Sequence, residues 1–409
     1  MSNTAAPGSD DIAYPQAYRD LIVVCIALTL AMLSNTMLLL TVPFKALELG
    51  ISASLIGLIL SAPYILPLAL AIPIGGFVAR TGAQKVILFG SLGMAVGPIC
   101  SLLFQGVGGL LANQVIAGMS NIVLIIAAQS LVAGLGQGKA LERCFGWFTT
   151  CMSAGQLVGP LLAGLVIEHY SVNHAFVLIA AFPLLASISA LMFTVHARQG
   201  TPAPRAQAGY RAQWRLLNTN RGVQLSILLS AISLFVMSVH SSFMPVYLES
   251  LAISAGTIGL LLSTRALASM LVRVFMSRII QLLGGRTATI RIAVFTTVIC
   301  LMLTGLAGDM IALLALLAVG IGIAGGLSQP LSMVILSESV SREQRAPSLA
   351  MRLMGNRGAQ VAAPVLVGLI ADFTGFTTAF ALVPLLLLAL FLFWSRRAGL
   401  GSTYDLDRR

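Results

Sequence analysis

Charged residues are scarce in this sequence. Asp, Glu, Lys and Arg together make up 9% of its 409 residues, whereas hydrophobic residues make up 58%. A soluble protein of this size carries about a quarter charged residues, so the composition excludes that class and indicates a protein embedded in a lipid bilayer. The first nineteen residues contain two aspartates and lack a basic start before an apolar core, so no cleavable signal peptide is expected.

Cysteine is also rare and forms no CxxC pair, which argues against a disulfide framework and against a zinc site. The sequence contains no GxxxxGK[ST] phosphate loop and no HExxH, GxSxG or HxxxxD motif. We therefore expect no ATP-driven activity, no metal or other cofactor, and no catalytic residues. A membrane-embedded enzyme is a remote alternative, because the four histidines lack carboxylates at a useful spacing.

Long apolar runs, by contrast, recur along the whole chain. A helix that spans a bilayer needs about 20 mostly apolar residues, and short polar breaks separate runs of this length. The sequence therefore predicts an all-α membrane protein with twelve transmembrane helices. Their expected ranges are 20–43, 53–78, 84–105, 108–136, 143–167, 172–195, 222–248, 255–277, 287–307, 310–337, 345–371 and 376–395.

Positive charge is distributed unevenly between the two ends of these helices. Of the 24 Lys and Arg residues, 20 fall on one side of the predicted membrane and Lys45 alone falls on the other. By the positive-inside rule both termini are cytoplasmic, and we expect a multi-pass protein of the cytoplasmic (inner) membrane. The net charge of +11 is then a topology signal, and no nucleic-acid partner is expected.

The sequence contains one internal repeat. Residues 49–61 match 251–263 at nine of thirteen positions, at an offset of 202, and 155–176 align with 359–380 at an offset of 204. Two parallel six-helix halves follow. The expected organisation is an N-terminal tail at 1–19, a first bundle at 20–195, a cytoplasmic linker at 196–221, a second bundle at 222–395 and a C-terminal tail at 396–409.

Duplicated six-helix bundles around a central site are the plan of a large class of transporters. The chain resembles the major facilitator superfamily along nearly its whole length, and in particular its twelve-helix drug:proton antiporters. This resemblance implies a secondary transporter that alternates access to a central site. It also implies a small-molecule substrate, H⁺ as the coupling ion, a lipid bilayer as surroundings and a monomeric state.

The stretch 146–164, GWFTTCMSAGQLVGPLLAG, resembles the fifth-helix motif of the superfamily's antiporters, with alanine for one glycine. Small residues four apart let two helix backbones approach closely, and a proline bends the helix. In the family this face meets the other half and seals one side of the pathway, here near the helix that begins at Ala255. Generic small-residue packing is the alternative. The motif residues are Gly146, Gly155, Gly159, Pro160 and Gly164.

A second motif follows the second predicted helix and resembles the cytoplasmic signature of the superfamily. Its matching residues are Gly75, Arg80, Gly82 and Lys85. Ala79 stands where the family carries an aspartate that helps to close a gate. We therefore expect that contact to be weaker here, or to be made by other residues.

Two further positions depart from the family pattern. Gln114 stands where related proton-coupled drug antiporters carry an arginine, and Asn35 lies where many cation exporters place a carboxylate. No Asp or Glu falls near the middle of a predicted helix. The usual carboxylate that carries the proton is therefore missing.

The predicted membrane interior instead carries positive charge. Arg265 lies about ten residues into the eighth span and Arg357 about twelve residues into the eleventh, near mid-depth at about 1.5 Å per residue. A charge at that depth is costly unless it faces water or a partner. We predict that both arginines line a substrate cavity biased toward anionic or zwitterionic compounds; a purely structural role is the alternative for each.

Four weaker candidates complete the predicted cavity. Histidine titrates near neutral pH, so His240 is a candidate proton carrier, with hydrogen-bonded packing as the alternative. Asn35, Gln114 and Gln329 are uncharged hydrogen-bonding residues that either face the substrate or hold helices together. The leading functional prediction is a proton-coupled exporter of small amphipathic compounds, including anions. An importer or facilitator of an organic anion, such as a siderophore or metabolite, is the second.

Overall fold

The computed structural model describes residues 17–193, 217–341 and 344–397, and within these ranges the chain is helical and contains no strand. Twelve long helices correspond to the twelve predicted spans, which confirms the all-α prediction. They are α1 (Ala17–Glu48), α2 (Ala53–Thr81), α3 (Ala83–Leu103), α4 (Val107–Ala133), α5 (Gly138–His169), α6 (Val172–Ala190), α8 (Arg221–Ser250), α9 (Ala255–Val274), α11 (Arg286–Thr304), α12 (Ile311–Ser339), α13 (Arg345–Thr374) and α14 (Phe376–Arg397). Most of the predicted tails and linker lies outside the described residues.

Several helices differ from the predicted spans at their ends. α1 continues to Glu48, five residues past the end expected at 43, and α5 begins at Gly138 instead of 143. The run expected at 255–277 divides, because α9 ends at Val274 and a short helix, α10 (Met276–Leu282), follows it. Apolar composition marks only the hydrocarbon layer of about 30 Å, whereas helical hydrogen bonding continues into the polar region beyond it.

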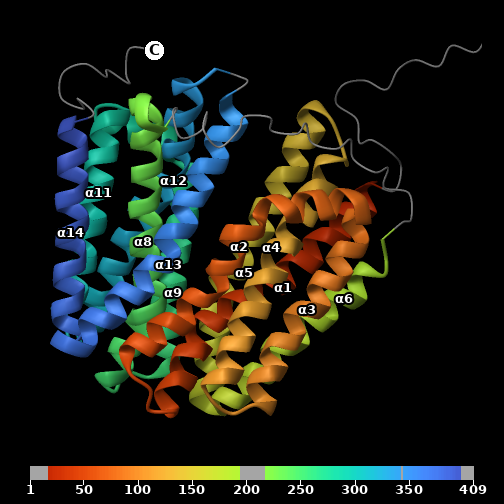
Figure 1. Cartoon of the computed structure of the whole chain (residues 1–409), viewed down its shortest axis with the longest axis horizontal. Coiled ribbons are helices and arrows are strands. Elements are labelled where there is room, and N and C mark those ends of the chain that lie inside the picture. The colour runs from red at the N-terminus through yellow and green to blue at the C-terminus, as the bar shows by residue number, and fades with distance from the viewer. Residues whose placement is uncertain (1–16, 194–216, 342–343, 398–409) are drawn as a thin grey trace, which may run out of the picture.

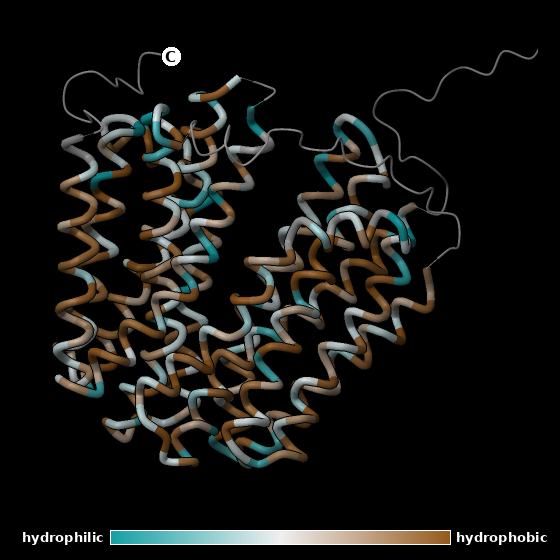
Figure 2. Tube along the Cα trace, in the orientation of Figure 1, coloured by the Kyte–Doolittle hydropathy of each residue, from teal (hydrophilic) through white to brown (hydrophobic). Residues whose placement is uncertain are grey.

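In the described part of the chain, eleven helices are long and apolar enough to cross a membrane. The remaining long helix, α13, carries three arginines, at 345, 352 and 357. Large apolar side chains stay exposed, among them Phe89, Leu103, Leu386 and Phe393. Figure 2 shows hydrophobic residues along the helices of both bundles. Such a surface suits lipid rather than water, and the chain is a multi-pass membrane protein.

The helices gather into two bundles that approach each other at one end. Figure 1 shows α1–α6 on one side and α8–α14 on the other, diverging toward the top of the view. The strongest packing between the bundles joins α2 to α13 and α5 to α9. We call the end where the bundles meet the closed side, and the opposite end, at which α14 reaches Arg397, the open side.

Glycines allow the backbones to touch at the closed side. A Cβ on Gly57 of α2 would overlap the carbonyl oxygen of Pro364 of α13, and a Cβ on Gly259 of α9 would overlap that of Pro160 of α5. The internal repeat relates the two contacts, because an offset of 202 separates the glycines and an offset of 204 separates the prolines. The repeated stretches are therefore the surfaces by which the two bundles meet.

Candidate substrate cavity

Two adjoining pockets lie between the bundles and together form what we call the central cavity. The larger has about 1030 Å³ of space, part of it open to solvent, and the smaller has about 600 Å³ counted in the same way. Helices α1, α2, α8 and α13 contribute to both pockets, α4 to the smaller, and α5 and α9 to the larger. The residues shared by the two linings are Asn35, Leu39, Tyr64, Ser241 and Ser242.

Arg265 is held in the larger pocket by α9, where it is 8% exposed. Its Nη2 donates a hydrogen bond to Oγ of Ser241 on α8, at 3.2 Å. Its Nε is buried and finds no acceptor among the described residues. Arg273 lies two turns further along the same helix and also lines this pocket. The wall contributed by α9 therefore carries two arginines, of which Arg265 keeps a buried N–H without an acceptor among the described residues, whereas Nη2 of Arg273 donates to Oγ of Ser269 at 3.4 Å.

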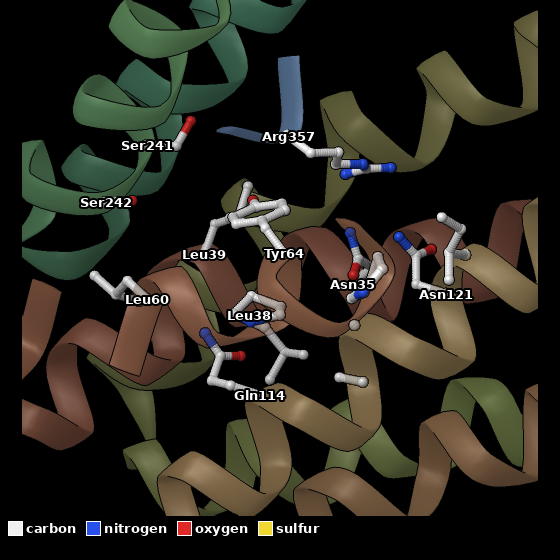
Figure 3. A pocket seen from close by; sticks show the side chains of 15 residues that line it. Asn35, Leu38, Leu39, Leu60, Tyr64, Gln114, Asn121, Ser241, Ser242 and Arg357 are labelled. Atoms are coloured by element: carbon white, nitrogen blue, oxygen red, sulfur yellow. The ribbon is translucent and has the colours of Figure 1, made fainter. Parts of the chain in front are cut away.

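Arg357 of α13 reaches the smaller pocket from the other wall. Its Nη1 donates to Oε1 of Gln360 at 3.1 Å, and its guanidinium lies 5.8 Å from the centre of the Tyr64 ring. Tyr64 belongs to α2, so this cation–π contact joins the two bundles across the cavity. Figure 3 shows Arg357 close to Tyr64, with Asn35 on one side of the ring and Gln114 further away, beyond Leu38.

Sequence reasoning did not select Tyr64 as a site residue, although it is the one aromatic side chain in both linings. Asn121 of α4 was also missed; it lines the smaller pocket, and its Oδ1 is buried without a partner among the described residues. One signal was available for Tyr64, since it lies between Pro63 and Pro67 in an otherwise apolar span. Prolines in such a helix free backbone groups that need polar neighbours.

The central cavity carries net positive charge. Its charged lining residues, within the described part of the chain, are Arg265, Arg273 and Arg357, and neither lining contains an Asp or Glu. Removing an arginine from water without an opposite charge is costly, and a site of low dielectric strengthens any attraction to an anion. Leu39, Leu262 and Met270 add apolar surface to the same space.

Two predicted cavity residues lie elsewhere. His240 is fully buried in α8, outside both linings, and neither ring nitrogen has a hydrogen-bond partner among the described residues. Gln329 of α12 holds helices together, because its Nε2 donates to the carbonyl oxygen of Ser230 at 3.2 Å and its Oε1 accepts from Nη2 of Arg352 at 2.8 Å. The structure thus groups Asn35, Gln114, Arg265 and Arg357 but not these two.

Arg352 is a buried arginine and one of the 20 basic residues that the sequence analysis places on the cytoplasmic side. It is 5% exposed within α13 and donates to Gln329 and to Oγ of Ser332, the latter at 2.7 Å from Nη2. Its acceptors belong to α12, a different helix, so no local pattern in the sequence distinguishes it from a solvated arginine. Its partners make it a helix-packing residue.

The fifth-helix motif divides into two contacts. Gly155 and Gly159 pack against α1 inside the first bundle, where Thr36 Oγ1 donates to the carbonyl oxygen of Gly155 at 2.8 Å. Gly164 instead packs against the backbone of Ala255 in the other bundle, beside the Pro160 contact described above. A Cβ at Gly146 would meet no atom within 4 Å. The motif therefore allows close helix packing both inside the first bundle and between the two bundles at the closed side.

The second motif lies on the open side. Gly82 takes a positive φ of 90° and forms the turn between α2 and α3, a backbone conformation that glycine adopts without strain. Arg80 and Lys85 are exposed, and the described residues offer them no hydrogen bond or ion pair. Gly75 lies within α2, but its surroundings are outside the described set. Because the bundles diverge here, this motif makes no described contact between them.

A polar cavity between two duplicated helical bundles, open at one end and closed at the other, defines a membrane transporter of the alternating-access class. The chain belongs to the Major Facilitator Superfamily, whose family model matches residues 24–251 and 226–403. It is therefore a transporter and not an enzyme.

Its relatives include bacterial drug-efflux proteins. The chain is 22% identical to Multidrug resistance protein 1 of Bacillus subtilis over 360 residues, which is 87% of this chain and 91% of that protein. It is 23% identical to Multidrug efflux pump LfrA of Mycolicibacterium smegmatis over 192 residues, 46% of this chain but only 38% of LfrA. The fold is also that of a bacterial homolog of the human lysosomal transporter Spinster in an inward-facing, unoccupied conformation. That structure gives a TM-score of 0.78 at 14% identity, over 95% of this chain and 98% of the other.

Proposed function

We propose that this protein is a proton-coupled secondary transporter that exports small amphipathic compounds carrying an anionic group. It works as a monomer in the cytoplasmic membrane, with both termini in the cytoplasm and the bundles at 20–195 and 222–395 rocking against each other. The main observation behind this proposal is a pair of arginines in the central cavity, the buried Arg265 and the half-buried Arg357, which no acidic lining residue neutralises within the described chain.

The preference for an anion follows from the donors that the protein leaves unused. A guanidinium has five N–H donors in a fixed fork, and a carboxylate or phosphate accepts two of them at once. Arg265 uses one donor on Ser241 and Arg357 uses one on Gln360, while the Nε of each stays without an acceptor among the described residues. An anionic group bound between them would take up these donors and neutralise the charge.

The amphipathic character follows from the rest of the lining. Ser241, Ser242 and Asn35 offer hydrogen bonds, whereas Leu39 and Met270 offer apolar surface. Small-molecule sites commonly combine an apolar wall with a few polar groups that orient the ligand, and both kinds of group line the central cavity. The proposed substrate therefore has one charged end and an apolar body.

The proposal also includes export and proton coupling. Both are supported by the antiporter-type motif in α5 and by the similarity to proteins named as multidrug efflux and multidrug resistance proteins. His240 is the proposed proton carrier, because the linings offer no carboxylate and both of its ring nitrogens lack partners among the described residues. Import or facilitated diffusion of an organic anion is the second candidate, favoured by the glutamine at position 114 and by the lack of a lining carboxylate.

Ligand-induced thermal stabilisation of the purified protein tests the anion preference. Matched anionic, neutral and cationic amphiphiles are compared on wild type, Arg265→Ala and Arg357→Ala, with Arg278→Ala on the exposed face of α10 as the matched control. A ligand at about 100 times its Kd stabilises a protein by about 2.7 kcal/mol. We expect anions to stabilise wild type and the control but not the two cavity variants. Stabilisation by cations that both cavity variants retain would overturn this part.

Transport in liposomes separates the two candidates. For the exporter, uptake of a stabilising anion into proteoliposomes should change in rate when a pH gradient is imposed, and His240→Gln should abolish that dependence. For the facilitator, counterflow of the same anion should proceed at the same rate with and without the gradient. Transport that is indifferent to the gradient therefore refutes proton coupling.

A further inference from the structure

At the closed side each bundle directs one carboxylate to the first turn of a helix in the other bundle. Asp372, near the end of α13, accepts hydrogen bonds from the backbone N–H groups of Ala53, at 2.8 Å, and Ser54, at 2.9 Å. Glu168, near the end of α5, accepts one from the N–H of Gly256, at 2.7 Å. Both contacts cross the interface between the bundles.

The two contacts are copies of each other. An offset of 204 carries Glu168 to Asp372, and an offset of 202 carries Ser54 to Gly256. The carboxylates therefore occupy equivalent positions in the two halves and cap equivalent helices. A chance surface contact would not be expected to recur at both places. The two contacts therefore belong to one arrangement that is repeated in each half of the chain.

The helix ends leave these N–H groups available. The first four N–H groups of a helix have no partner inside it, and each of the two helices has a serine in its own bundle that satisfies the third one. Ser52 accepts from the N–H of Leu55 at 3.4 Å, and Ser254 accepts from that of Thr257 at 3.3 Å. Among the remaining N–H groups, those of Ala53, Ser54 and Gly256 donate to the carboxylates of the other bundle.

Charge makes these contacts favourable but reversible. The N-terminus of a helix carries about half a positive charge, so a carboxylate binds it more strongly than a neutral oxygen does. Glu168 and Asp372 are both exposed, and the described residues give neither of them an ion pair. When the bundles separate, water can replace both partners at modest cost.

We propose that Glu168 and Asp372 are two latches that hold the closed side shut and release when the transporter turns to the opposite access state. The inference rests on the alternating access described above, but not on the substrate or the coupling ion. Each latch positions one helix of the opposite bundle through its charge. Loss of the carboxylate charge shifts the equilibrium between the two access states on the order of tenfold.

Hydrogen exchange read by mass spectrometry tests this proposal on the purified, ligand-free protein. Glu168→Gln, Asp372→Asn and the double variant remove charge at nearly constant shape. Glu249→Gln and Asp309→Asn are the matched controls, since these two residues are exposed and the described structure shows no side-chain hydrogen bond or ion pair for either. Asp372→Glu keeps the charge and tests whether charge is the cause.

We expect reciprocal changes at the two ends of the cavity. In the double variant, exchange should rise on the order of tenfold at 53–56 and 255–258 and should fall at 266–273, which lies toward the open side of α9. Asp372→Glu should remain close to wild type. A rise in exchange confined to the helix ends, with no change at 266–273, would overturn the proposal. That result would show that the carboxylates cap the two helices without affecting the equilibrium between access states. Equal effects of Asp372→Glu and Asp372→Asn would also overturn it.

This experiment is independent of transport. If reciprocal exchange is found but no anion is transported, the substrate proposal fails and the latches stand. If an anion is transported under a pH gradient but exchange in the double variant matches the two controls, the latches fail and the transport proposal stands.

Discussion

The substitution Gly164→Ala should drive the two bundles apart at the closed side. A Cβ at this position would lie 3.0 Å from the carbonyl carbon of Ala255 and 3.1 Å from the Cα of Gly256, and closer still to the Ala255 carbonyl oxygen. Carbon atoms in ordinary contact are about 3.5–4.0 Å apart, so α5 and α9 must separate by at least about 0.5 Å. All three neighbours are backbone atoms, so no side-chain rotation relieves the overlap.

The cost of this overlap falls on one conformation only. Overpacking costs about 1–3 kcal/mol, which corresponds to about 5- to 150-fold in an equilibrium. Ala255 and Gly256 belong to the other bundle, so the cost disappears when the closed side opens. Alanine also stabilises a helix interior by about 0.5–1 kcal/mol relative to glycine in every conformation. The expected result is a shift in access state without loss of the fold.

Cysteine labelling measures this shift. A cysteine introduced at Met270, which lines the central cavity on α9, is labelled with a bulky maleimide, and the same protein without it corrects for the native cysteines. We expect Gly164→Ala to slow labelling by about fivefold or more. Gly146→Ala is the control, because a Cβ there would meet no atom within 4 Å. Equal labelling rates in the two variants would refute the reasoning.

Two further predictions concern arginines that face different surroundings. Arg352→Ala should destabilise the second bundle by about 2–4 kcal/mol, because it strands buried acceptors on Gln329 and Ser332. Denaturant unfolding measures this, and unchanged stability with lost ligand binding would instead make Arg352 a substrate residue. Tyr64→Leu should weaken binding of a stabilising anion by about 2- to 30-fold, since it removes a cation–π contact worth about 0.5–2 kcal/mol from Arg357. Titration should find Tyr64→Phe near wild type, and an equal loss in both variants would show that the hydroxyl, not the ring, matters.

Much of the fold could be predicted because it depends on composition over short stretches. An apolar run of about 20 residues is stable as a helix in lipid whatever its neighbours are, so the twelve helices could be located to within several residues. The repeat at offsets of 202 and 204 predicted two equivalent halves. It did not predict what the repeated residues do, because similarity between two segments does not say which surfaces they share.

The site was predictable only in part. A mid-membrane arginine needs a polar partner, and this reasoning selected Arg265 and Arg357, which the structure places at the central cavity. The same reasoning selected His240, which lies outside both linings, and it missed Tyr64. Both faces of these helices are apolar, one toward lipid and one toward other helices, so helical periodicity cannot tell which side chain faces the cavity.

The amino-acid sequence is sufficient to predict that this chain lies in a membrane, forms twelve helices and contains two copies of one six-helix bundle, because each of these properties depends on local composition or internal similarity. Which polar residues contact each other depends on how the helices pack. The tertiary structure placed Arg352 against α12 instead of solvent, and it brought Glu168 and Asp372, which lie near helix ends in the sequence, to helices of the opposite bundle. These hydrogen bonds join residues that are separated by 88 positions in one case and by 319 positions in the other. No local sequence pattern predicts them, since only packing of the two bundles brings the atoms together.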